Sequence, residues 1–386
     1  MVKILFLYEI EIPTVSIARN HWLNLSDKYN IICRFVSLID VKKGDLNWCD
    51  ILILIRPNNS FSWRIARRAR EAGRFVITMC DDDLLHLPAS HPNLLWQRKG
   101  VIRALNNSSV ILSSSRYLIV QMMDYTADKR GAYIDTIVKP GEVMKRHHEE
   151  ENKCVEIVYA AGGGQHEKNF EQFVLPALKK IAARIPNSFS LTFVSVHPNC
   201  KGLEKKVQVN YVKGMSLIEY RKFMEKRKFD IGIAPLEDNN FTKCKYFNKY
   251  LEYTISGVVG IYSNIEPYIY VVQDRVNGLL AENNEKSWED KLAIAIQDSA
   301  LRRSCVQHAQ EHVLNTFNEQ SIMENLFTDI PELFSITEKY DDCRGFRGCY
   351  IQYRVLRCIE YIYKIGFYMK REGLRSVIRK FILRLK

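Results

Sequence analysis

The sequence predicts an α/β protein made of two Rossmann-like halves. Short apolar runs alternate with segments of helical spacing, the alternation stops near residues 139–153, and it then starts again. The apolar runs are continuous, as in strands that are buried on both faces of a parallel sheet. Their alternation with helices favours doubly wound sheets. A length of 386 residues agrees with two or three domains of about 150 residues each.

The expected elements follow in order along the chain. A first domain at 1–140 should contain strands at 2–8, 30–38, 50–56, 74–80 and 109–115 and helices at 60–73, 91–106 and 116–125. A polar linker at 141–153 follows it. A second domain at 154–335 should contain strands at 155–161, 189–196, 229–236 and 258–263 and helices at 169–184, 217–228, 242–256, 286–298 and 301–314. Residues 336–386 form a tail.

Charge is concentrated in that tail. Residues 344–386 carry a net charge of +10 out of +12 for the whole chain, which leaves the preceding 343 residues nearly neutral. A nucleic-acid enzyme more often spreads positive charge over its main face, so a nucleic-acid partner is not expected. A short basic tail indicates an anionic surface instead, and membrane lipid is the first candidate.

The tail also has helical periodicity. Arg354, Arg357, Lys364 and Arg371 fall on one side of a helical wheel with Tyr361 and Tyr368, and the opposite side carries Ile351, Val355, Ile359 and Ile362. A second amphipathic stretch follows Gly373, with Leu374, Val377, Ile378, Phe381, Ile382 and Leu385 on one face. Such basic amphipathic helices lie in membrane interfaces. The alternative is that the apolar face packs on the protein or on a second copy.

Other classes of protein are disfavoured. The longest aliphatic run, residues 51–55, is far shorter than the roughly 20 residues that cross a bilayer. The N-terminus enters a strand-like run without a cleavage site, so we expect a cytoplasmic protein, peripheral on the inner membrane face. None of the ten cysteines forms a Cys-x-x-Cys pair, which argues against a zinc site or a disulfide framework.

A glycine-rich loop follows the first strand of the second domain. Gly162, Gly163 and Gly164 precede a helix, and His166 and Lys168 come directly afterwards. Glycines let the backbone approach a phosphate, and a helix N-terminus favours negative charge. A tight turn without a ligand explains the same residues equally well. The loop lacks the G-x-G-x-x-G pattern of dinucleotide-binding proteins.

A second candidate site lies in the predicted helix at 242–256. Lys245, Lys249 and Glu252 recur at intervals of four and three residues, which places them on one helical face. Two lysines there could neutralise a diphosphate, and a carboxylate one turn further could accept hydrogen bonds from both ribose hydroxyls. The alternative is a solvated face with an ordinary Lys–Glu pair.

A run of carboxylates ends the fourth predicted strand of the first domain. Asp81, Asp82 and Asp83 could bind an acceptor substrate, cap a helix or hold a hard cation. The family resemblance described next favours acceptor binding over a metal ion for these carboxylates. His86 and His91 follow, and either could approach the reacting carbon, although an isolated loop histidine is more often structural.

The second half of the chain resembles the nucleotide-binding half of GT-B glycosyltransferases, in particular the large family-4-type group of retaining enzymes. The matching segments, in order, are 162–169, 229–236, Lys245, Lys249, 251–253, 256–259, 266–268, 277–280 and Trp288. The first half is similar more loosely, through Arg56, 81–84 and 113–115. The resemblance covers about four-fifths of the chain.

This resemblance implies two Rossmann-like domains facing a central cleft, and the charge and periodicity of the tail add a basic amphipathic helical extension at the C-terminus. It implies transfer of a sugar from a nucleoside diphosphate to an acceptor hydroxyl, with retention of configuration and without a metal or other cofactor. Glu252 would hold the ribose, Lys245 and Lys249 would face the diphosphate, and the glycine loop with His166 would cap it. The acceptor would be a glycan or a lipid-linked sugar in surface polysaccharide or glycolipid assembly.

One residue departs from the family pattern. Many relatives have a second glutamate eight residues before the ribose-binding one, where this chain has Cys244. That change puts the sugar contacts in doubt, and Glu237 and Asp238 are the nearest candidates to replace them. It also keeps open the alternative of an inactive GT-B-like binding subunit. A sugar-nucleotide epimerase of the same fold is a third possibility.

Overall fold

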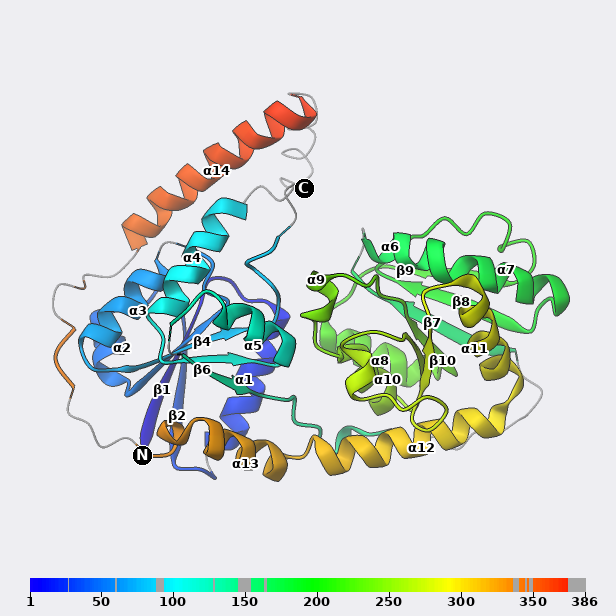
Figure 1. Cartoon of the computed structure of the whole chain (residues 1–386), viewed down its shortest axis with the longest axis horizontal. Coiled ribbons are helices and arrows are strands. Elements are labelled where there is room, and N and C mark those ends of the chain that lie inside the picture. The colour runs from blue at the N-terminus through cyan, green and yellow to red at the C-terminus, as the bar shows by residue number, and fades with distance from the viewer. Residues whose placement is uncertain are drawn as a thin grey trace. The chain divides into compact units, whose positions relative to one another are not determined.

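The computed structural model describes residues 1–26, 28–59, 61–87, 94–127, 129–144, 154–162, 165–335, 340–343, 346 and 350–373. The chain folds into two compact units, coloured in chain order in Figure 1. Unit 1 comprises Met1–Asp135 and Met323–Lys386, and unit 2 comprises Thr136–Ile322. Residues from 323 onward thus belong to the first unit, whereas the sequence placed residues up to 335 in the second domain.

Unit 1 has a parallel sheet whose described part has six strands in the order β2-β1-β3-β4-β5-β6. The strands are β1 (Val2–Tyr8), β2 (Ile31–Ser37), β3 (Ile51–Ile55), β4 (Phe75–Cys80), β5 (Val110–Ser113) and β6 (Arg130–Tyr133). The helices are α1 (Pro13–Ser26), α2 (Lys43–Trp48), α3 (Ser62–Glu71), α4 (Leu94–Asn106) and α5 (Arg116–Met123). After β2 the chain returns to the other side of β1, so the strand order reverses between β1 and β3.

Unit 2 has a second parallel sheet, with six strands among its described residues in the order β12-β11-β10-β7-β8-β9. They are β7 (Val155–Ala160), β8 (Phe189–Val194), β9 (Gln208–Val212), β10 (Ile231–Ala234), β11 (Val259–Ser263) and β12 (Leu279–Ala281). Here the order reverses between β7 and β10, as in a Rossmann fold.

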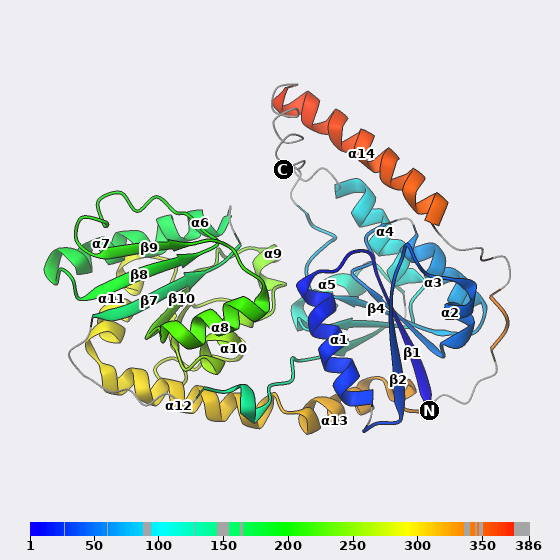
Figure 2. The ribbon, with the colours of Figure 1, turned by 180° about the vertical axis from the view of Figure 1, so that it is seen from behind.

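Helices cover both faces of the second sheet. They are α6 (Gln165–Asn169), a π-helical segment (Phe170–Val174), α7 (Leu175–Arg184), α8 (Leu217–Arg227), α9 (Asn240–Lys243), α10 (Asn248–Ile255), α11 (Glu285–Gln297) and α12 (Ser299–Thr316). Short 3₁₀ turns lie at Pro140–Glu142 and Tyr268–Tyr270. Figure 2 shows α8 in front of this sheet and α1 in front of the first.

The alternation of apolar side chains along the second sheet builds two cores. Ile157 and Ile233 belong to one cluster, and the residues that follow them, Val158 and Ala234, belong to the other. Gly232 has a specific reason to be glycine, because a Cβ there would stand 2.6 Å from the Tyr253 ring of α10. The close approach brings α10 against the sheet and fixes the position of the residues that it carries.

The expected helix at 242–256 is wrong in one respect. It consists of two short helices, α9 and α10, separated by residues 244–247. Asn239 accepts a hydrogen bond from the Thr242 backbone N–H at 2.9 Å and caps the first. Lys245 therefore lies in the connecting turn and does not share a helical face with Lys249 and Glu252.

The C-terminal part of unit 1 is helical. Helix α13 (Glu319–Asp329) begins in unit 2 and ends in unit 1, and a 3₁₀ turn (Pro331–Leu333) and the long helix α14 (Tyr350–Glu372) follow it. The second amphipathic stretch, at 374–386, lies outside the described residues. No described helix combines the length and apolar character needed to span a membrane.

Candidate functional site

The reversal of strand order in unit 2 defines a position for a ligand. In doubly wound sheets a ligand binds beyond the carboxyl ends of the two strands that flank the reversal. Here β7 leads into Ala161 and Gly162, and β10 leads into 235–239. Gln165 at the start of α6 donates a hydrogen bond of 3.1 Å to Glu237 Oε2 and joins the two segments. Gly163 and Gly164 lie outside the described residues.

Gly162 itself stands in open space. A Cβ at this position would meet no atom within 4 Å, so packing within the chain does not require a glycine. The site next to it is accessible, which agrees with a backbone that a bound group could approach.

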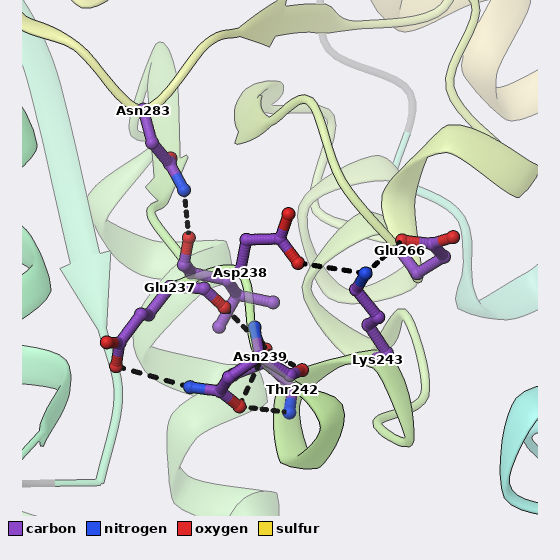
Figure 3. Close-up of polar contacts among 8 residues, drawn as sticks. Glu237, Asp238, Asn239, Thr242, Lys243, Glu266 and Asn283 are labelled. Atoms are coloured by element: carbon purple, nitrogen blue, oxygen red, sulfur yellow. Dashed lines mark hydrogen bonds and ion pairs between the residues drawn. The ribbon is translucent and has the colours of Figure 1, made fainter.

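The segment that follows β10 is held firmly in place (Figure 3). The Leu236 N–H donates to Ser263 Oγ at 2.9 Å, and Asn283 Nδ2 donates to the Leu236 carbonyl at 2.7 Å. Ser263 Oγ donates in turn to Asn283 Oδ1 at 2.6 Å. Residues at the ends of β11 and β12 thus fix the loop that carries Glu237 and Asp238.

Cys244 is not exposed at this loop. Its side chain is fully buried, so the position at which relatives carry a glutamate points into the interior. Asp238 instead forms an ion pair of 3.0 Å with Lys243 Nζ, which also lies 4.0 Å from Glu266. Figure 3 shows Glu237 and Asp238 pointing to opposite sides of this loop. These two carboxylates are the acidic groups that the fold places next to the reversal.

Helix α10 carries an ion pair of a lysine and a glutamate on its partly exposed side. Tyr250, Leu251 and Tyr253 are buried, whereas Lys249 and Glu252 retain about a quarter of their side-chain exposure and form an ion pair. The Lys249 ammonium also lies 5.2 Å from the centre of the Tyr220 ring. The expected Lys–Glu contact therefore exists, in a partly buried setting rather than on a fully solvated face.

His166 brings the glycine loop and α10 together. Burial, followed by the positive charges of Lys245 and Lys249, lowers the pKa of His166 from 6.5 to about 4. Because both lysines lower this pKa, the side chains of His166, Lys245 and Lys249 lie close together. Lys168 lies exposed on α6. The structure thus gathers His166, Lys245, Lys249 and Glu252, with two cations and a neutral imidazole where an anion would be stabilised.

The carboxylates of unit 1 divide into two groups. Arg56, which has a left-handed φ of 49°, lies 3.4 Å from Asp81 and 3.0 Å from Asp82. Thr14 donates a hydrogen bond of 2.5 Å to Asp81. Burial raises the pKa of Asp81, and the Arg56 cation opposes that rise. A strained arginine between two carboxylates at a strand end is typical of a functional site.

Asp83 has a different role. Its Oδ1 accepts the backbone N–H groups of Leu85 and His86, and its Oδ2 lies 2.9 Å from His86 Nδ1. His86 Nε2 lies 2.8 Å from the Tyr125 hydroxyl. Asp83 therefore caps the turn at 83–86, whereas the sequence interpretation was a helix cap. His91 lies outside the described residues, among which no cluster of three or more His, Cys, Asp or Glu side chains could hold a metal ion.

Sequence reasoning missed Glu9, which follows β1 directly at the reversal in unit 1. Its carboxylate accepts hydrogen bonds from Asn59 at 2.9 Å and Tyr353 at 3.1 Å and pairs with Arg357 at 3.0 Å. The last two residues come from α14, so the tail helix docks on the carboxyl edge of the first sheet. An acidic residue directly after a buried strand is a signal that could have identified Glu9. It could not have identified its partners from α14.

Solved structures share this architecture, although no protein-family model and no curated protein sequence matches the chain. HepE from Anabaena, solved with UDP and glucose, aligns with a TM-score of 0.58 and 12% identity over 86% of this chain and 100% of HepE. The lipopolysaccharide outer core galactosyltransferase WaaB aligns with a TM-score of 0.53 and 13% identity, over 86% of this chain and 99% of WaaB. TarM aligns with a TM-score of 0.55 and 14% identity over 74% of this chain, and the alignment spans only 55% of TarM.

This chain has the GT-B fold. The GT-B fold accounts for two parallel sheets with reversals in strand order, each with polar residues beyond the carboxyl ends of its strands. In unit 2 of this GT-B protein the gathered residues are His166, Lys245, Lys249 and Glu252, and in unit 1 they are Arg56, Asp81 and Asp82. Identities of this size establish the fold and leave the activity to the chemistry of these residues.

The pKa of His166 gives a prediction about stability. Between pH 6.5 and about 4 the unfolded chain binds a proton that the folded chain does not, so stability should fall as the pH falls through this window. The free energy of unfolding of the wild type should fall between pH 7 and pH 5, and we expect His166→Gln to make this fall smaller by about 1–2 kcal/mol. Urea unfolding at both pH values measures it. His308→Gln, at an exposed histidine, is the control, and equal acid losses in the wild type and His166→Gln would contradict the assignment.

Proposed function

We propose that this protein is a glycosyltransferase that moves a sugar from a nucleoside diphosphate to an acceptor hydroxyl. The observation that carries the proposal is the convergence of His166, Lys245, Lys249 and Glu252 at the reversal of the second sheet in a GT-B fold. A diphosphate needs positive charge, and a ribose needs a hydrogen-bond acceptor that can take two hydroxyl donors. These four side chains supply both chemistries in one place.

The reaction follows from these groups. The bond between the anomeric carbon and the diphosphate oxygen breaks, and negative charge grows on the departing diphosphate. Lys245 and Lys249 stabilise that charge most strongly in the transition state. We propose that the donor sugar is transferred with retention of configuration and without a metal ion. Glu237 and Asp238 are the proposed partners of the sugar hydroxyls, because Cys244 is buried.

The acceptor side is proposed to lie in unit 1. Arg56, Asp81 and Asp82 offer charged hydrogen-bond partners at the carboxyl end of β3 and β4. We propose a glycan or lipid-linked acceptor in surface polysaccharide or glycolipid assembly, at the cytoplasmic face of the membrane, with residues 344–386 attaching the protein to anionic lipid. WaaB, which acts on the lipopolysaccharide outer core, supports this context as a protein of the same fold.

Ligand-dependent melting tests the donor proposal. HepE was solved with UDP and with UDP-glucose, so uridine nucleotides are the first ligands to screen, followed by other nucleoside diphosphates. At a concentration of about 100 times the dissociation constant, a ligand of the folded state stabilises it by roughly 2.7 kcal/mol. A rise in the melting temperature that persists in EDTA supports metal-independent donor binding. A panel without any stabilising nucleotide would reject the proposed site.

A second assay separates the enzymatic alternatives. Transfer of labelled sugar into a membrane lipid extract indicates a transferase, and isomerisation of the donor without acceptor indicates an epimerase. Donor binding without either reaction would favour the inactive subunit. We expect transfer that chelator leaves largely intact, and full inactivation restored by a divalent metal would overturn the metal-independent mechanism.

A further inference from the structure

Helix α14 turns its apolar face away from the protein. Ile351, Val355, Ile359 and Ile362 recur along one side of the helix and are 76%, 54%, 44% and 69% exposed. The opposite side carries Tyr353 and the side chains that pair with Glu9. This arrangement rules out the packing of the apolar face on the described part of unit 1, and it leaves a stripe of large aliphatic side chains in contact with solvent.

The basic side of α14, by contrast, is partly used within the protein. Arg357 lies 3.0 Å from Glu9 and 2.9 Å from Glu360, so its charge is largely neutralised. A helix that lies on a membrane usually supplies its own cations on the polar face. Arg354 and Lys370 of α14 are exposed, so this helix keeps part of its own charge, and neighbouring helices add more.

Helices α3 and α4 supply that charge. The outer side of α3 exposes Arg64, Arg67, Arg68 and Arg70, and the outer side of α4 exposes Arg98, Lys99 and Arg103. Glu71 is the acidic residue on these two helices, paired at 3.6 Å with Arg67 and 3.9 Å with Arg68. Arg70 donates to the Asn106 carbonyl at 2.9 Å and joins the two helices. We call these seven basic side chains the α3–α4 patch.

Trp63 connects the α3–α4 patch to α14. The guanidinium groups of Arg64, Arg67 and Arg103 lie 5.5, 5.6 and 4.9 Å from the centre of the Trp63 indole. Trp63 also packs against the hydrophobic cluster that contains Tyr353, whose ring centre lies 5.9 Å from that of Phe61. The start of α14 thus packs beside the start of α3.

We propose that the α3–α4 patch and the exposed aliphatic face of α14 form one surface that binds an anionic phospholipid bilayer. The aliphatic side chains would enter the interface, the indole would lie at headgroup level, and the arginines would contact lipid phosphates. Stable attachment requires two signals, and this surface offers both an apolar and a basic one. The inference extends the membrane context of the proposed function from the tail to the body of unit 1, and its test does not depend on transferase activity.

Vesicle co-sedimentation of the full chain tests the contribution of the α3–α4 patch. Each basic residue near an anionic surface contributes about fivefold to binding, so replacing Arg64, Arg67 and Arg103 together by Gln should weaken binding to phosphatidylglycerol-containing vesicles by roughly a hundredfold. The matched control replaces Lys201, Lys205 and Lys206 of unit 2 by Gln, which removes the same charge from another exposed region. That control should change binding by less than about threefold.

A single substitution tests the contribution of the exposed aliphatic face of α14. Ile362 on α14 and Ile218 on α8 are both 69% exposed, which makes them a matched pair. Ile362→Ser should weaken vesicle binding by about tenfold, the value for one aliphatic side chain leaving an apolar environment, and Ile218→Ser should leave it unchanged. Raised salt should weaken wild-type binding, and phosphatidylcholine alone should bind poorly.

Several outcomes would overturn the proposal. They are wild-type protein that ignores anionic vesicles, an arginine variant that binds as the wild type does, equal losses in the two charge variants, and patch-dependent binding of a nucleic-acid duplex instead of vesicles. The melting temperature of each variant reports its folding. If the triple arginine variant unfolds, Arg68→Gln with Lys99→Gln, which do not contact Trp63, should still lower binding by about 25-fold. UDP-dependent melting, measured in parallel, shows whether the donor proposal stands or fails separately.

Discussion

Replacing Lys245 by alanine is expected to slow sugar transfer by about 10²–10³-fold, the range for removing one group that stabilises developing negative charge. Lys245 lies in the turn before α10, and its charge acts on His166. The donor diphosphate gains charge as it leaves, so the lysine should stabilise the transition state more than the bound donor. Ground-state donor binding should weaken by less than about tenfold.

Steady-state turnover and the dissociation constant of the donor, measured on the same protein, check this result. Lys245→Arg should recover part of the rate because it keeps the charge. Lys226→Ala, an exposed lysine in the last turn of α8, should behave as the wild type does. Equal losses in turnover and affinity would mean that Lys245 only binds the donor, and no loss would place it outside the site.

Replacing Glu252 by alanine is expected to weaken donor binding by about 1.5–3 kcal/mol, or roughly 10–150-fold. The expected cause is the loss of charge-assisted hydrogen bonds to the ribose hydroxyls. Because Glu252 also pairs with Lys249, its removal frees a cation near the diphosphate, which would by itself strengthen donor binding. A net loss of affinity therefore points to the ribose contact and not to the ion pair.

Two further variants separate these effects in calorimetric titrations with UDP. Lys249→Ala breaks the same ion pair but leaves the carboxylate, and it should weaken binding through the diphosphate. Asp290→Ala breaks the exposed Lys286–Asp290 pair of α11, at 2.8 Å, and should not affect binding. Unchanged affinity in folded Glu252→Ala would exclude the ribose role.

The sequence determined the fold class and the elements that dominate it. The continuous apolar run of β3 and, after Lys3, that of β1 admit few environments other than a buried parallel strand, because both faces of each run must leave water. The alternation of these runs with helices then restricts the topology to doubly wound sheets. Gly162 was a candidate because it follows such a strand, and Lys249 and Glu252 were candidates because their helical spacing places them on one face.

The tertiary structure decided what these residues can do. Local spacing placed Lys245 on one helical face with Glu252, but α9, which Asn239 caps at its N-terminus, ends at Lys243, and Lys245 lies in the turn before α10. Spacing along the chain also could not bring His166 to Lys245, because their proximity depends on β7 and β10 being neighbours in the sheet.

The same limit applies to the tail. Its sequence determined an amphipathic basic helix, since periodicity is a local property of the chain. Only packing showed which face is used, with Arg357 and Tyr353 directed to Glu9 and the aliphatic residues left exposed. The arginines around Trp63, at 64, 67 and 103, come from two helices, and Arg103 is more than 30 residues from the other two in sequence. Charges that are distant in the chain become one surface only when helices pack side by side, and no pattern within a single segment contains that information.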